Sequence, residues 1–222
     1  MSFCKLPEGQ VAALVFIKAI TSSDKAPQQV KDLVASRDWH TLAVAVSLAN
    51  PGKPVPNEGD FAAIGNLPQG QQDVNFVLAM VDAQGTDQAK QQLQSALDTH
   101  CWDQVAGGLS DAMTSTGIRF SGADLHQAYA PGDNSPCTGP SDLDKMVGEI
   151  VRSGQLVGTF FSQSLPDFFA NGFGKVSDFF TGDFAGFFTN VGEQIGHGFE
   201  QFADDVKSTL EKIGEKLNPS NW

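Results

Sequence analysis

An eleven-residue repeat rich in phenylalanine, in the last third of the chain, most constrains what the sequence can fold into. Apolar residues recur every eleven positions in two series, one from Phe169 to Ile213 and one from Phe173 to Leu217. Eleven residues are close to three helical turns, so this stripe stays on one face of a helix and favours a slight right-handed supercoil. The repeat predicts an amphipathic helical segment over residues 167–217, about 75 Å long.

This segment is expected to need a partner. Eight glycines lie between Gly172 and Gly214, and each costs about 1 kcal/mol relative to alanine inside a helix. A column of small residues, from Ala170 to Gly214, runs beside the stripe and lets another backbone approach closely. The residues expected to contact a partner are Phe169, Phe173, Phe180, Phe184, Phe187, Val191, Ile195, Phe202, Val206, Ile213 and Leu217.

The aromatic and glycine-rich run over residues 167–188, DFFANGFGKVSDFFTGDFAGFF, resembles repeats of known proteins. It is similar to the eleven-residue repeats of bacteriophage tape-measure proteins. It is also similar to helical segments of phage internal or ejection proteins and of some secreted pore-forming toxins. The chain departs from a tape measure in being far shorter. The resemblance implies a helical component of a large assembly, with contact to a membrane as a further option.

The first two-thirds of the chain contain a second, longer repeat. Residues 11–47 align without gaps onto residues 74–110. Eight residues are identical at this offset of 63 positions. In the first copy they are Val11, Asp24, Ala26, Gln28, Gln29, Trp39, Ala43 and Ser47. In the second copy they are Val74, Asp87, Ala89, Gln91, Gln92, Trp102, Ala106 and Ser110, in the same order. Apolar positions persist where the identities do not, which favours an internal duplication. We expect a helical domain over residues 5–130, with copies at about 11–67 and 74–130.

Each copy is expected to be helical, because no stretch shows the alternation of β-branched residues that is typical of strands. The pattern predicts one helix over about 9–21 and a second that starts near Pro27, passes through Trp39 and ends near residue 48. A shorter segment led by Phe61, or by Phe120 in the other copy, should follow. Trp39 and Trp102 should each anchor the core of their copy, since a tryptophan buries a large apolar area.

The fold class is therefore predicted to be all-α, with a duplicated helical domain followed by a long amphipathic helical segment. Residues 131–141 are rich in proline, glycine and serine and should form a linker. Residues 142–222 should form the assembly segment, beginning with a helix marked by Leu143, Val147 and Ile150. No run of about 18 uncharged apolar residues exists, so we expect no transmembrane helix, and the N-terminus lacks the features of a signal peptide.

Residues with catalytic chemistry are scattered, and we expect no catalytic site, no cofactor and no metal. The three cysteines, Cys4, Cys101 and Cys137, lack the spacing of a zinc site or a disulfide framework. The sequence leaves open whether Cys101 and Cys137 form a disulfide. It also leaves open whether these two cysteines form a site with His100 and His126. The cysteine pattern favours a reducing compartment, and so a virion or cytoplasmic protein.

The net charge is −12, and no basic face is present that could bind phosphates, so nucleic acid is not an expected partner. The first hypothesis is a non-enzymatic structural subunit that self-associates, or docks in a large complex such as a phage virion, through the stripe. The alternative is a membrane-active protein, such as an ejection component, a pore former or a lipid-surface coat, whose stripe lies in a lipid interface. The acidic polar face weakens this alternative.

Overall fold

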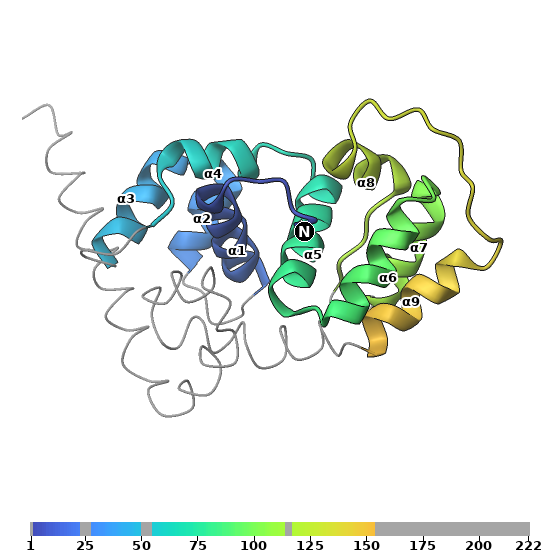
Figure 1. Ribbon diagram of the computed structural model, residues 1–222. Coiled ribbons are helices and arrows are strands. Elements are labelled where there is room, and N and C mark those ends of the chain that lie inside the picture. Colours follow the sequence, from blue (N-terminus) through green and yellow to red (C-terminus); the bar gives the residue numbers. More distant parts are fainter. Residues whose placement is uncertain (1, 23–27, 50–54, 114–116, 154–222) are drawn as a thin grey trace, which may run out of the picture. The chain divides into compact units, whose positions relative to one another are not determined.

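The computed structural model describes residues 2–22, 28–49, 55–113 and 117–153 (Figure 1). This part of the chain is helical and contains no strand, as the sequence predicts. Its helices are α1 (Glu8–Ser22), α2 (Gln28–Ser36), α3 (Trp39–Ala49), α4 (Glu58–Gly65), α5 (Gln69–Gln84), α6 (Asp87–Leu97), α7 (Trp102–Ala112), α8 (Gly122–Tyr129) and α9 (Leu143–Ser153). None of these described helices is long and apolar enough to cross a bilayer. The expected segment over 167–217 lies outside the described residues.

The described helices fall into two compact units. Residues 12–65 belong to one unit, while residues 2–11 and 66–153 belong to the other. We call α1–α4 the first quartet and α5–α8 the second quartet. Within the first quartet, α3 packs against α2 and α4; within the second, α8 packs against α5 and α7. The helix α9 adds to the second quartet by packing against α6 and α7.

The helix bounds of the two quartets correspond closely. Adding 63 to the bounds of α3 (39–49) gives those of α7 (102–112), and adding 64 to those of α4 (58–65) gives those of α8 (122–129). Both short helices begin with the same reciprocal cap. The Asn57 side chain and Asp60 exchange hydrogen bonds with each other's backbone amides at 3.0 Å, and Ser121 and Asp124 do so at 3.2 and 2.9 Å.

The expected equivalence of Phe61 and Phe120 is wrong. Phe61 lies inside α4 and is fully buried, whereas Phe120 precedes the cap of α8. The connection before α8 is one residue longer than the one before α4, so Leu125, also fully buried, takes the position of Phe61. The apolar position in the core is kept although the aromatic residue is not.

The long second helix expected from Pro27 to residue 48 is also wrong, because the chain turns at Arg37. Arg37 has a φ of 58°, and the amides of Arg37 and Asp38 bond back to the carbonyls of Val34 and Leu33 at 3.2 and 2.9 Å. This pairing of amides and carbonyls is a common way to end a helix. The Asp38 carboxylate then accepts the amide of Thr41 at 3.1 Å and caps α3.

The same left-handed turn recurs in the second quartet. His100, 63 positions after Arg37, has a φ of 57°, and these two are the described non-glycine residues with a positive φ. A left-handed conformation costs an ordinary residue about 1–2 kcal/mol. The quartets thus share a strained turn that neither sequence marks with glycine or asparagine.

The cores are built from the residues that the apolar pattern selects. In the first quartet, Phe16 and Phe61 meet edge to face with ring centroids 6.2 Å apart. Trp39 is buried, as predicted, and its ring lies so close to Gly65 that a β-carbon there would overlap it. The predicted first helix, 9–21, is confirmed as α1, in which nine consecutive residues from Ala12 to Ile20 are buried.

Replacing Arg37 by glycine should relieve the strain of the turn. Arg37→Gly is expected to raise the free energy of unfolding by about 0.5–1 kcal/mol, since glycine adopts a positive φ without steric cost but loses more entropy on folding. Urea unfolding measures the change. The control Ala35→Gly, at an exposed position within α2, should lower stability by about 1 kcal/mol. A destabilised Arg37→Gly variant would contradict the assignment of strain.

Candidate functional site

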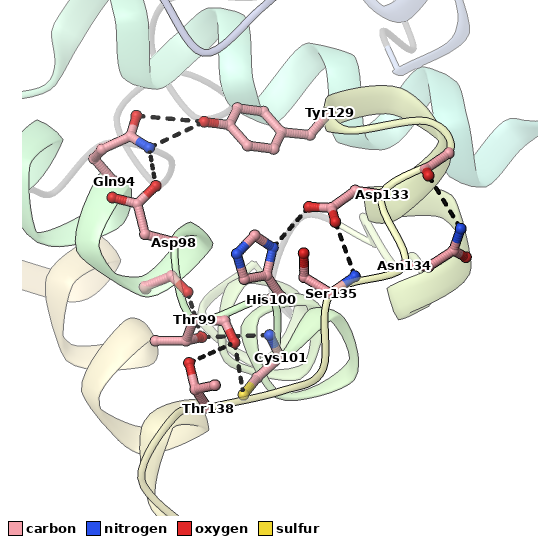
Figure 2. A network of polar contacts seen from close by, with 12 residues as sticks. Gln94, Asp98, Thr99, His100, Cys101, Tyr129, Asp133, Asn134, Ser135 and Thr138 are labelled. Atoms are coloured by element: carbon pink, nitrogen blue, oxygen red, sulfur yellow. Dashed lines mark hydrogen bonds and ion pairs between the residues drawn. The ribbon is translucent and has the colours of Figure 1, made fainter.

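The main polar cluster of the described residues joins the α6–α7 turn to the loop that precedes α9 (Figure 2). The Thr99 carbonyl accepts the Thr138 amide at 2.9 Å. Nδ1 of His100 lies 2.7 Å from a carboxylate oxygen of Asp133, and Cys101 forms a disulfide with Cys137. Three consecutive turn residues therefore each hold a different part of the loop. His100 has the left-handed conformation of this turn, and its two neighbours, Thr99 and Cys101, contact the loop with it.

The segment 131–141, expected to be a linker, is thus an anchored loop. Further along it, the Gly139 amide donates to Sγ of Cys101 at 3.1 Å. The loop leads into α9, which we expected to belong with the C-terminal segment but which packs on the second quartet. The helix start at Leu143 is confirmed, and Leu143 and Val147 are buried. The sequence could not show that the cross-link and α9 extend the helical domain to residue 153.

The disulfide is the Cys101–Cys137 pair that the sequence leaves open. Cys101 is buried and Cys137 is exposed, while Cys4 is a buried free thiol. Burial raises the pKa of the Cys4 thiol, which keeps it in its unreactive protonated form. Disulfides persist in oxidising environments and are rare in the cytosol. The cross-link therefore weighs against the reducing compartment that the cysteine pattern favoured.

An aromatic cluster flanks the polar network. Trp102 stacks on His126 with ring centroids 5.3 Å apart and meets His100 edge to face at 5.7 Å. The ring of Tyr129 lies at 6.3 Å from Trp102, and the Lys5 ammonium lies 5.3 Å from the centre of the Tyr129 ring. Trp102 is half-buried, so, unlike Trp39, it lies at the edge of its core.

The four-residue site considered for His100, Cys101, His126 and Cys137 is brought together only in part. The rings of both histidines contact Trp102, but the two sulfurs are bonded to each other and are not free to bind a metal. Within the described residues, no group of three or more His, Cys, Asp or Glu side chains is arranged to hold a metal ion. Nε2 of His126 is buried and meets no hydrogen-bond partner in this part of the chain.

Ser110, in the run Gly108–Ala112 that is one residue short of a G-x-S-x-G nucleophile elbow, has a structural role. Its hydroxyl donates to the Phe120 carbonyl and accepts the Phe120 amide, each at 3.2 Å. This pair of bonds ties the end of α7 to the residue that precedes the cap of α8. The serine is buried within α7 and is not placed at a strand-to-helix turn.

A groove of about 850 Å³ lies between α6 and α9. Uncharged polar side chains and two alanines of α6 form one wall, and the α9 wall is apolar except for Glu149. Met146, in the apolar wall, is the large hydrophobic residue that stands exposed among the described ones, at 49%. The lining residues are Thr86, Gln88, Ala89, Gln91, Gln92, Ser95, Ala96, Thr99, Pro140, Leu143, Met146, Val147 and Glu149.

The predicted partner-binding residues, from Phe169 to Leu217, all lie outside the described residues. Neither the α6–α9 groove nor the anchored loop is marked by a motif in the sequence. The recurrence of Ala89, Gln91 and Gln92 between the copies was the one available signal, since all three line the groove. No family model, no curated protein and no solved structure matches the chain, so the resemblance to phage repeats stays a prediction.

The Asp133 carboxylate should make the anchored loop sensitive to acid. The Ser135 hydroxyl and amide, and then His100, hold the pKa of Asp133 below its usual value of 3.8. A pKa lowered by folding stabilises the native state above the unfolded-state pKa, and this stabilisation is lost as the pH falls through the native pKa. In urea unfolding, wild type should exceed Asp133→Asn in stability near neutral pH. The difference should shrink below about pH 3.8, and a difference independent of pH would contradict the assignment.

Removing the disulfide should destabilise the second quartet. Cys101 and Cys137 are 36 residues apart, and closing a loop of that length stabilises a protein by about 4 kcal/mol in the chain-entropy treatment. The Cys101→Ser/Cys137→Ser variant should lose stability of this order in urea unfolding. A reducing agent should destabilise wild type to a similar extent and leave the variant unchanged. Equal stability of oxidised and reduced wild type would show that the cross-link constrains little.

Proposed function

We propose that the protein is a non-enzymatic assembly subunit, in which a helical domain carries a Phe-rich C-terminal segment that associates with other copies or with neighbouring subunits. The observation that carries the proposal is the eleven-residue stripe, with its flanking column of small residues. Its glycine content makes an isolated helix unfavourable by several kcal/mol. A segment of this kind folds stably when a partner covers its apolar face.

The described domain supports this proposal because it buries its own apolar residues. Its fully buried side chains include Phe3, Phe16, Phe61 and Phe76, and only Met146 stands exposed among its large hydrophobic residues. The stripe from Phe169 to Leu217 should extend about 70 Å as a helix. The described residues therefore expose little apolar surface that could cover a stripe of that length.

The correspondence between the quartets supports a duplication of the helical domain as part of the proposal. The shared bounds of α3 and α7, the shared caps of α4 and α8, and the left-handed turns at Arg37 and His100 are independent features. An assembly subunit with two copies of one helical unit can present two related surfaces. The resemblance to phage repeats suggests a virion as the setting of such a subunit.

Charges placed on the stripe should dissolve the assembly. Wild type is expected to be oligomeric in size-exclusion chromatography with light scattering. The variant Phe169→Asp/Phe180→Asp/Phe202→Asp should be monomeric, because three carboxylates cannot be buried against an apolar partner without neutralising charges. The control Asn171→Asp/Gly182→Asp/Thr189→Asp adds the same charge opposite the stripe and should stay oligomeric. A monodisperse wild-type monomer contradicts the proposal.

Lipid is the alternative partner for the same stripe. An amphipathic helix with a broad aromatic face can lie in a lipid interface, but Asp167, Asp178, Glu200 and Glu211 give this helix an acidic polar face. Anionic lipid is therefore unfavourable, and neutral vesicles are the appropriate test. Flotation with phosphatidylcholine liposomes together with dye release, both abolished by the stripe variant, would favour the membrane-active function.

A further inference from the structure

The start of α9 packs against the disulfide itself. A β-carbon built on Gly139, shortly before the helix, would lie 2.9 Å from Sγ of Cys101, 3.0 Å from Cδ2 of Leu143 and 3.2 Å from the β-carbon of Thr99. The Gly139 amide also donates to Sγ of Cys101 at 3.1 Å. The cross-link and the first turn of α9 therefore meet at one closely packed point.

An apolar pair holds α9 on the second quartet. Leu143 and Val147, one helical turn apart, are buried, and α9 packs against α6 and α7. The approach is close at Gly108 of α7, where a β-carbon would overlap the Asp144 carbonyl and lie 2.8 Å from the β-carbon of Val147. Because α9 has only eleven residues, it is too short to be a stable helix alone in water. Its helical structure depends on this contact.

The disulfide adds a covalent link to contacts that are otherwise reversible. The noncovalent contacts include the hydrogen bond from the Thr138 amide to the Thr99 carbonyl and the contact between His100 and Asp133 (Figure 2). The chain from the cap of α8 to Cys137 comprises residues 131–137. Closing a loop of about seven residues shifts an equilibrium roughly 50-fold in the chain-entropy treatment. Breaking the bond should shift α9 toward an undocked state by a factor of this order.

The two sulfurs lie in different surroundings, which decides how a thiol can attack the disulfide. Cys137 is exposed, whereas Cys101 is buried and is the N-cap residue of α7. An attacking thiolate therefore reaches Sγ of Cys137, and Sγ of Cys101 is the leaving group. The Gly139 amide and the positive end of the α7 dipole both stabilise the departing thiolate. A stabilised leaving thiolate makes the exchange faster.

We propose that the Cys101–Cys137 bond is a redox switch that controls the docking of α9, with a dithiol as its reductant. One thiolate of the dithiol bonds to Sγ of Cys137, and the S–S electron pair departs with Sγ of Cys101. The second thiolate then displaces Sγ of Cys137. The protein disulfide gains two electrons and two protons, and the dithiol loses them and becomes an intramolecular disulfide. The loop and α9 are then held by noncovalent contacts alone.

This switch goes beyond the proposed assembly function and does not depend on what the stripe binds. It acts when the protein passes between oxidising and reducing surroundings, since these decide whether a protein disulfide persists. The stripe follows α9 in the sequence, beginning at Phe169. Undocking α9 therefore lengthens the covalent link between the second quartet and the stripe.

Trypsin cleavage of the full-length protein after Lys145 tests the switch, because Lys145 lies within α9. The cleavage rate follows the population of the open form when opening and closing are fast. Wild type is reduced with dithiothreitol, and the reagent is removed without air before trypsin is added. Reduction should accelerate cleavage of the Lys145–Met146 bond by roughly 10- to 50-fold, as measured by mass spectrometry. Cleavage after Lys90, inside α6, should remain slower, because the quartet stays folded.

Matched variants identify the responsible bond. Cys101→Ser/Cys137→Ser should be cleaved after Lys145 at the faster rate with or without reduction. Cys4→Ala, which removes the free thiol, should respond to reduction like wild type. Val147→Ala weakens the apolar pair and should be cleaved faster than wild type in both redox states. If the double serine variant fails to fold, as judged by circular dichroism, oxidised and reduced wild type still give the comparison.

Two results would overturn the inference. One is a rate of cleavage after Lys145 that does not change on reduction. The other is an equal rate after Lys145 and Lys90 in the reduced protein, which would mean that the whole quartet opens. The direction of attack has its own readout: brief treatment with 2-mercaptoethanol and acid quenching should leave the mixed disulfide on Cys137, and an adduct on Cys101 would contradict the assigned leaving group.

Discussion

The left-handed turn between the second and third helix of each quartet is the constraint on which the rest of the described structure depends. At Arg37 and at His100 the chain reverses direction within a few residues, so that the tryptophan helix folds back instead of continuing. In the second quartet the same turn presents Thr99, His100 and Cys101 to the following loop. A backbone hydrogen bond, the contact between His100 and Asp133, and a disulfide then fix that loop.

The anchored loop explains why the second quartet carries α9 while the first has no described helix in the same position. Tethering residues 133–139 shortens the path to Leu143 and places α9 where its apolar pair reaches Gly108. Pre-ordering the connection lowers the entropy cost of docking the helix. The first quartet keeps the turn but has no such loop, and its three-residue connection to α5 leaves the matching face without a described helix.

The sequence was sufficient where local pattern and packing agree. The periodicity of α1, the apolar pair of α9 and the burial of Trp39 were all predicted, because helical spacing and side-chain volume decide them. The break at Arg37 was missed because arginine carries no turn signal, and the conformation is imposed by the packing of α3 on α2 and α4. The Cys101–Cys137 bond was left open because residues 36 apart meet only once the turn and loop have folded.

The candidate interaction surfaces also differ in how far the sequence predicts them. Periodicity alone selects the stripe residues from Phe169 to Leu217, since a helix converts spacing into a face. The difference in burial between Leu33 and Ala96 becomes visible only when the quartets are aligned by their helix bounds. A half-buried leucine on a helix surface is ordinary. The burial of Ala96 follows from the packing of α9 on α6, which no pattern within α6 alone predicts.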